Sequence, residues 1–135
     1  MLRKVILLWT VAILVVGCGQ NDWKTTDDVQ VLSEAKSPDG NHIATVFSCS
    51  GGGAAGYVYT NVNLRKAEEE LNQREFLLGK HLWNSYANIS VEWKDSATLD
   101  IVYQWSSNTP AYKKENGQQV REKNGVQINY TLRGE

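Results

Sequence analysis

The chain has 135 residues, of which 41% are hydrophobic and 10% aromatic, and its formal net charge is −1. This length is typical of one domain with a single core. Without the N-terminal segment, which carries Arg3 and Lys4, 12 basic residues face 15 acidic ones, a net charge of −3. Such mild acidity argues against nucleic-acid binding, which needs clustered basic side chains to displace phosphate counterions.

Residues 1–17 have the pattern of a signal peptide. Arg3 and Lys4 form a positive segment, and residues 5–16 are apolar apart from one Thr. Twelve residues of helix reach about 18 Å, too short for a bilayer core of about 30 Å. The pattern therefore favours a signal-peptide core over a stable transmembrane anchor, although a short membrane anchor stays an alternative.

The apolar segment ends in the cleavage box Val15, Val16, Gly17 and Cys18. This box resembles that of bacterial lipoproteins, in which an aliphatic residue, a small or aliphatic one and Gly or Ala precede a Cys. The resemblance implies that diacylglycerol is attached to the Cys18 thiol, that the chain is cut after Gly17, and that acyl chains anchor the protein in the envelope membrane. Gly19 is compatible with the outer membrane in a cell with two membranes, and the domain then faces the periplasm or the exterior.

Three parts are expected: a signal peptide at 1–17, a lipidated tether at 18–28 and a single β domain at 29–135. Once Cys18 carries lipid, no second cysteine remains in the mature chain to form an intramolecular disulfide with Cys49. We expect Cys49 to be a small buried apolar residue. An enzyme that uses Cys49 as its nucleophile is a second alternative function.

Alternation of apolar and polar residues dominates from Asn41 onward and predicts strands. It is clearest at 89–93, 99–105 and 126–132, and residues 43–47 are apolar on both faces, as in a central strand. Residues 29–32 add a short strand before a Ser-Pro-Asp-Gly turn at 37–40. Residues 65–73 predict a short surface helix or an ordered loop. The fold class is mainly β: a small antiparallel β-sandwich or open barrel of about six or seven strands, with an N-terminal signal helix.

Two hairpins are expected. In the first, strands at 89–93 and 99–103 place all their apolar residues on one face. Its predicted pairs are Val91 with Ile101, Trp93 with Leu99, and Ile89 with Tyr103.

The second hairpin contains Asn124-Gly125, and two registers compete. A two-residue turn pairs Lys123 with Val126 and sets Arg121 opposite Ile128. A three-residue bulged loop pairs Val120 with Ile128 instead and keeps the basic residues off the buried face. We expect the bulged loop, because register follows the buried face.

Gly51, Gly53 and Gly56 spell G-x-G-x-x-G, the spacing of a dinucleotide-binding turn. That turn needs a helix to start within the glycines, whereas the residues from Tyr57 onward are β-forming. We therefore expect no nucleotide cofactor and a wide turn between two strands, where glycine permits positive φ. The candidate interaction loop consists of Ser50, Gly51, Gly52, Gly53, Gly56 and Tyr57.

This loop also resembles the Ser-Gly-rich segment of secreted and lipidated lysozyme inhibitors. The resemblance implies an inhibitor of a cell-wall-degrading enzyme that acts through the Gly51 to Gly56 loop. Gly56 stands where that family has a basic residue, and the cysteines of the family are missing.

A second resemblance covers the body of the chain. Its features are the turn at 37–40, the strand ending at Cys49, and a W-x5-L-x-I-x-Y hairpin carried by Trp93, Leu99, Ile101 and Tyr103. Together they resemble a group of small bacterial lipoproteins of uncharacterised activity. The resemblance implies a fold and no chemistry.

Catalytic patterns do not assemble. His42 and His81 have no metal-ligand spacing, and His42 is expected to be a solvated turn residue at a strand start. The glutamates at 68–70 are consecutive and predict solvated charge. We expect neither enzyme activity nor a metal nor a cofactor. The expected function is a lipid-anchored binding or interaction module, with the membrane and an envelope protein as partners and without nucleic acid or nucleotide.

Overall fold

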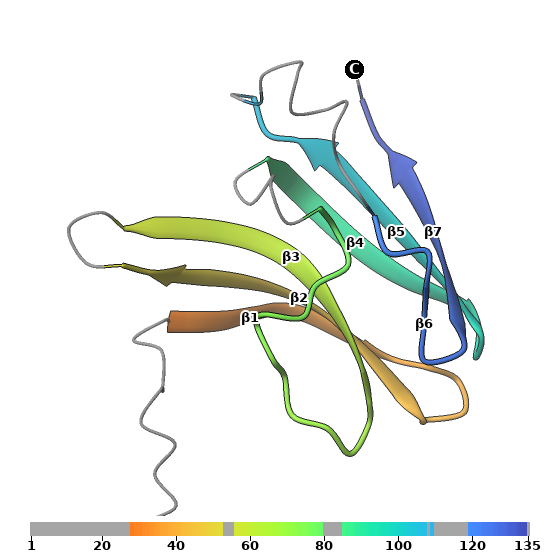
Figure 1. Ribbon diagram of the computed structural model, residues 1–135. Helices are drawn as coiled ribbons and strands as arrows, with labels where there is room; N and C mark the ends of the chain where they lie inside the picture. The colour runs from red at the N-terminus through yellow and green to blue at the C-terminus, as the bar shows by residue number, and fades with distance from the viewer. Residues whose placement is uncertain (1–27, 53–55, 80–84, 108, 110–118, 135) are drawn as a thin grey trace, which may run out of the picture.

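The computed structural model describes residues 28–52, 56–79, 85–107, 109 and 119–134. They form two sheets that face each other without closing into a barrel, and no helix occurs in this part of the chain (Figure 1). The mainly β prediction is confirmed. The strands are β1 (Asp28–Lys36), β2 (His42–Gly51), β3 (Tyr57–Lys66), β4 (Tyr86–Asp95), β5 (Thr98–Trp105), β6 (Glu122–Lys123) and β7 (Val126–Leu132).

The first sheet has the order β1-β2-β3 and is antiparallel throughout. Its central strand, β2, contains the apolar residues 43–47 that predicted such a position. β1 is longer than the predicted segment 29–32, since its pairing with β2 continues to Lys36 opposite Ile43. β1 therefore pairs with β2 from Asp28 to Lys36, with one irregularity.

The Ser-Pro-Asp-Gly turn joins β1 to β2 as predicted. The Gly40 N–H donates to the Ser37 carbonyl at 2.8 Å, which closes the turn, and the Ser37 hydroxyl donates to the Asp39 carboxylate at 2.6 Å. The Ser37 hydroxyl and the Asn41 backbone N–H both favour the ionised form and lower the pKa of Asp39. Side-chain and backbone bonds thus fix the start of β2.

The second sheet has the order β4-β5-β7-β6. The β4–β5 hairpin pairs Val91 with Ile101 and Trp93 with Leu99, as the sequence predicts. The predicted one-to-one pair of Ile89 with Tyr103 is not formed, because the register shifts between Ala87 and Ser90 and leaves both Asn88 and Ile89 opposite Tyr103. Asn88 has a φ of +49° at this irregularity. Asparagine tolerates this left-handed backbone, so the shift occurs there.

The register predicted for the C-terminal hairpin is also wrong. Asn124 and Gly125 have φ of +53° and +75°, a two-residue type I′ turn, and Lys123 pairs with Val126. The Ile128 N–H donates to the Arg121 carbonyl at 2.9 Å, so Arg121 and not Val120 lies opposite Ile128.

The physical reason is that a basic residue at this edge keeps its charge in solvent. The Lys123 ammonium reaches the Glu75 carboxylate at 3.3 Å, while its stem lies on the same face as Val126. A long basic side chain can thus cover apolar surface and leave its head exposed. The preferred Asn-Gly turn then decides the register.

β7 lies parallel to β5, which the antiparallel expectation did not include. Leu99 pairs with Ile128, and Ile101 with Tyr130. The parallel pairing requires a crossover connection between the two strands. It brings Ile128 beside the β5 residues of the core.

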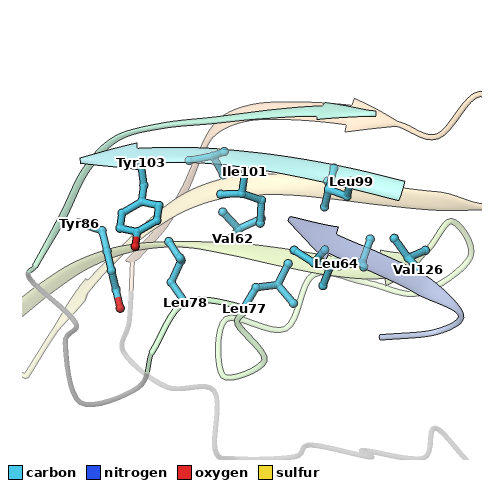
Figure 2. Packing of buried hydrophobic residues seen from close by; sticks show 12 residues of the cluster. Val62, Leu64, Leu77, Leu78, Tyr86, Leu99, Ile101, Tyr103 and Val126 are labelled. Carbon is cyan, nitrogen blue, oxygen red and sulfur yellow. The ribbon is translucent and has the colours of Figure 1, made fainter. Parts of the chain in front are cut away.

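The main core lies between the two sheets, and Figure 2 shows β3, β5 and β7 contributing apolar side chains to it. Its buried members are Ala44, Val46, Val62, Leu64, Leu77, Leu78, Tyr86, Leu99, Ile101, Tyr103, Val126 and Ile128. Backbone bonds join the sheets on one side, where the Leu77 N–H donates to Val62 and the Leu77 carbonyl accepts from Val120, both at 2.9 Å. On the other side the indole N–H of the half-buried Trp93 donates to the Ala35 carbonyl at 2.9 Å.

Three aromatic rings close one end of this core. Tyr86 lies edge-on to Tyr103 with ring centroids 5.6 Å apart and stacks on Trp105 at 5.4 Å. Burial raises the pKa of Tyr86 to about 12. Burial also raises the pKa of Tyr130, whose hydroxyl donates to the Leu77 and Val120 carbonyls. Both phenols are therefore held in the neutral form.

Candidate functional site

The glycine loop follows β2 and precedes β3. Ser50 and Gly51 are the last residues of β2, Gly52 has a φ of +85°, and Tyr57 begins β3. Gly53 lies outside the described residues, and Gly56 is exposed. The residues after the loop form a strand, as predicted, so β3 presents no helix N-terminus to a phosphate.

The strand ends that flank this loop form what we call the hairpin arm, residues 48–52 and 56–60. Figure 1 shows β2 and β3 running past the second sheet at this end. One face of the arm carries Ser48 opposite Thr60 and Ser50 opposite Val58. The serines and Thr60 are half-buried, and the Val58 side chain is 56% exposed. This face continues the row of core residues but no longer lies under the second sheet.

The opposite face of the arm is packed. Phe47, Cys49 and Tyr59 are buried there as a second apolar cluster. Tyr57 stacks on Tyr59 with ring centroids 6.1 Å apart, and the Tyr59 hydroxyl donates to the Gln73 carbonyl at 3.0 Å. Cys49 is fully buried, as the sequence predicts for a small apolar residue. A thiol in this position does not meet a substrate in solvent.

The second cluster is covered by an ordered loop, residues 67–79, which we call the covering segment. The sequence predicts a short helix or an ordered loop at 65–73, and the structure has the loop, since β3 continues to Lys66. Leu71 and Phe76 of the covering segment pack on Phe47 and Tyr59. The glutamates at 68–70 are exposed, as expected.

A polar row on β3 fastens the covering segment, and sequence reasoning missed it. Asn61 and Asn63 are 0% and 1% exposed, and Arg65 is 9% exposed. The Asn61 amide donates to the Leu78 carbonyl at 3.2 Å, and its oxygen accepts from the Leu78 N–H at 3.0 Å. This reciprocal pair binds the segment as a neighbouring strand would.

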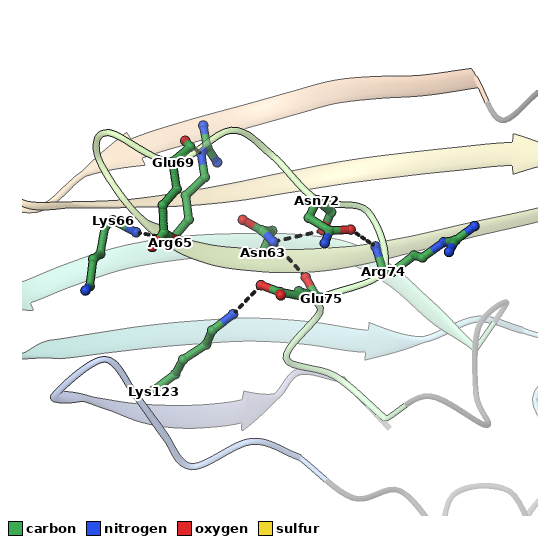
Figure 3. Close-up of polar contacts among 8 residues, drawn as sticks. All are labelled: Asn63, Arg65, Lys66, Glu69, Asn72, Arg74, Glu75 and Lys123. Carbon is green, nitrogen blue, oxygen red and sulfur yellow. Dashed lines mark hydrogen bonds and ion pairs between the residues drawn. The ribbon is translucent and has the colours of Figure 1, made fainter. Parts of the chain in front are cut away.

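The rest of the polar row acts on carbonyls of the same segment. Figure 3 shows Asn63 pointing toward Asn72 and Glu75, and its amide donates to their backbone carbonyls at 3.1 and 2.7 Å. The Arg65 guanidinium donates to the Glu69 carbonyl at 3.1 Å and to the Thr45 hydroxyl at 2.7 Å. Buried polar groups need such partners, so the row is structural. The pattern Asn-x-Asn-x-Arg on a strand is typical of a solvent-exposed face. Only the segment after it, which has no apolar periodicity, could have indicated that another part of the chain covers this face.

His42 is not the solvated turn residue that the sequence predicts. It is the first residue of β2, it is half-buried, and its ring lies 6.4 Å from that of Trp93. An open hollow of about 250 Å³ beside it is lined by Asn41, His42, Lys66 and Glu68. Among the residues that the structure describes, no group of three or more His, Cys, Asp or Glu could hold a metal ion. His81 lies outside those residues.

The cleavage box Val15, Val16, Gly17 and Cys18 lies outside the described residues, as does most of the tether. Within the part of the chain that is described, no helix is long and apolar enough to cross a membrane. Comparisons with protein-family models, with curated proteins and with solved structures gave no match to this chain.

Proposed function

We propose that this chain is a lipid-anchored envelope protein whose β domain binds a protein partner through the hairpin arm, without catalysis. The observation that carries the proposal is the contrast between the two faces of the arm. One face is fixed on the second cluster, and the other, with Val58 more than half exposed, continues past the second sheet.

The arm has a fixed base at Tyr59 and small residues in the sequence beyond it. Tyr59 is held by its hydrogen bond to Gln73 and by edge-on packing against Phe47 at 6.1 Å. Between Cys49 and Tyr57 every residue is Ser, Gly or Ala, and these side chains have little bulk. Small residues let a partner approach the backbone closely, and positive φ at Gly52 widens the turn. A rigid scaffold that carries a variable loop is the usual arrangement of a recognition site.

The burial of Cys49 supports binding over thiol catalysis. A nucleophile must contact its substrate, whereas Cys49 is 0% exposed and packs with Phe47 and Tyr59.

The membrane half of the proposal is tested at Cys18. Cys18→Ser removes the thiol that accepts diacylglycerol, so we expect loss of acyl labelling and an uncut precursor. Gel mobility and incorporation of a labelled fatty acid measure both effects. Equal incorporation in the Ser variant would contradict lipidation at Cys18.

The binding half is tested by site-specific photo-crosslinking of the full chain in its native membrane. A photoreactive residue at Val58 or Thr60 on the arm is compared with one at Thr131, which is exposed on β7. We expect one discrete crosslinked protein from both arm positions and none from position 131. If the crosslinked protein is a wall-degrading enzyme, the result would support the alternative that this chain inhibits that enzyme. Crosslinks from position 131 alone, or from no position, would overturn the assignment of the arm.

A further inference from the structure

β1 is an exposed edge of the first sheet. Among the strands that the structure describes, the order β1-β2-β3 gives it a hydrogen-bonded neighbour on one side only (Figure 1). Seven of its nine residues are exposed. Val31 and Leu32 are 53% and 57% exposed, although both are apolar. A long edge strand with exposed apolar residues is a template for pairing with another strand.

A bulge interrupts this edge at its centre. Val31 pairs with Phe47, and Ser33 pairs with the adjacent residue of β2, Val46. Leu32 is therefore an extra residue of β1 that has no pairing partner on β2. A bulge leaves the extra residue unpaired and bends the strand, here at Leu32. The extra residue breaks the ladder for any regular strand that would pair with β1.

The direction of the backbone groups follows from the turn that ends β1. The Ser37 N–H donates to the His42 carbonyl. In an antiparallel pair every second residue of β2 then faces β1. The β1 partners of those residues also face β2, and they are Ala35, Ser33, Gln30 and Asp28. The residues whose N–H and C=O groups face the free edge are Val29, Val31, Glu34 and Lys36. This set is symmetric about a point between Leu32 and Ser33.

From this symmetry we infer that β1 pairs with β1 of a second copy of this chain, antiparallel and about a two-fold axis beside Leu32. Val29 then lies opposite Lys36 of the second copy, and Val31 opposite its Glu34. Both bulges fall beside the axis, so the ladder continues on either side of them. A regular strand lacks the matching extra residue, and this favours a second copy over an unrelated strand.

The length of the tether allows this pairing when both copies are held in one membrane. This step rests on the proposed lipid anchor. In the antiparallel pair the two Asp28 residues lie nine positions apart along the strand axis, about 30 Å. From Cys18 to Asp28 there are ten residue steps, which reach about 35 Å when extended. Both copies can therefore be anchored in one membrane, which also concentrates them.

The test is thiol crosslinking of the full chain in lipid vesicles. Leu32→Cys places a thiol beside the axis, and a short bismaleimide then links two copies. Val58→Cys is the matched control, because Val58 is equally exposed on another strand. The unsubstituted chain is the blank, since Cys49 is buried and the Cys18 thiol carries lipid under the proposed anchor. We expect dimer from Leu32→Cys, monomer from Val58→Cys, and loss of the dimer when Val31→Glu is added to Leu32→Cys, because each new carboxylate then lies opposite Glu34 of the second copy.

Monomer from Leu32→Cys would overturn the inference, and so would equal dimer from Val58→Cys, which would indicate random collision. Flotation of the same vesicles tests the lipid anchor independently of the dimer. Photo-crosslinking from position 58 in the native membrane tests partner binding by the arm, also independently of the dimer. Retention of the dimer when Val31→Glu is added would also overturn pairing through this edge.

Discussion

The inner and outer halves of β3 have the same backbone geometry but different surroundings. In the inner half both faces are buried, with Val62 and Leu64 in the main core and Asn61, Asn63 and Arg65 under the covering segment. In the outer half Tyr59 is buried on one face, while Val58 on the other is 56% exposed. One strand thus serves folding along part of its length and is open to solvent along the rest.

The two buried faces of the inner half are stabilised by different means. Val62 and Leu64 contribute by leaving water, which depends on apolar area and not on direction. Asn61 contributes through directed bonds to the backbone of Leu78, which has no strand of its own. Polar side chains therefore replace a missing strand neighbour. The outer half has neither arrangement on its open face, where we propose that a partner binds.

The largest effect is expected for Leu64, on the apolar face. Leu64→Ala removes a fully buried side chain and leaves a cavity between the sheets, so the free energy of unfolding should fall by about 2–5 kcal/mol. Urea denaturation measures it. Leu132→Ala, at a side chain that is 41% exposed, is the control and should change stability far less. Equal losses would mean that the main core does not lie where the structure places it.

A somewhat smaller effect is expected for Asn61, on the polar face. Asn61→Ala leaves the buried N–H and C=O of Leu78 without their side-chain partner, which should cost about 2–3 kcal/mol. Faster hydrogen exchange at the Leu78 amide would show that the bond itself was lost. Asn129→Ala, on an exposed face of β7, is the control and should leave that amide protected. Unchanged exchange in Asn61→Ala would contradict the fastening role of the polar row.

Alkaline pH should weaken the aromatic end of the core. The pKa of Tyr86 is about 12 in the folded chain, against an ordinary value of 10, because burial disfavours the phenolate. Below pH 10 the phenol is neutral in both states. As pH rises from 10 to 12, the unfolded chain ionises first, so the free energy of unfolding falls. Denaturation at successive pH values should show a shallower fall for Tyr86→Phe, and an unchanged slope would place this ring in solvent.

Sequence reasoning recovered what alternation encodes. Val91, Ile101 and Leu99 alternate with polar neighbours, so their strands, their hairpin and their shared face could be predicted. The register at Lys123 could not, because a snorkelling stem lets the Asn-Gly turn override the apolar pattern. Asn88 shows a similar limit, since one residue with positive φ shifts the ladder without any change in periodicity.

The candidate site was predicted in the same partial way. The glycines and Tyr57 marked a turn between strands, and that part of the arm follows from local conformational preference. Asn61 and Asn63 were missed because hydrogen bonds to a segment up to seventeen residues away leave no local pattern. A polar residue on a strand is buried only when distant backbone supplies its partners, and this information is not in the strand.

The most direct test of the account is one substitution whose effects on stability and on crosslinking to the partner are both measured. Val58→Asp places a charge on the open face of the arm, where a surface change should alter the free energy of unfolding by no more than about 0.5 kcal/mol. The same change should abolish the crosslink from position 60 to the partner, because a partner that covers Val58 must bury that charge. Unchanged stability together with a lost crosslink is the predicted result. A loss of stability comparable to that of Leu64→Ala, or a crosslink that persists, would contradict the claim that the outer half of β3 serves binding and not folding.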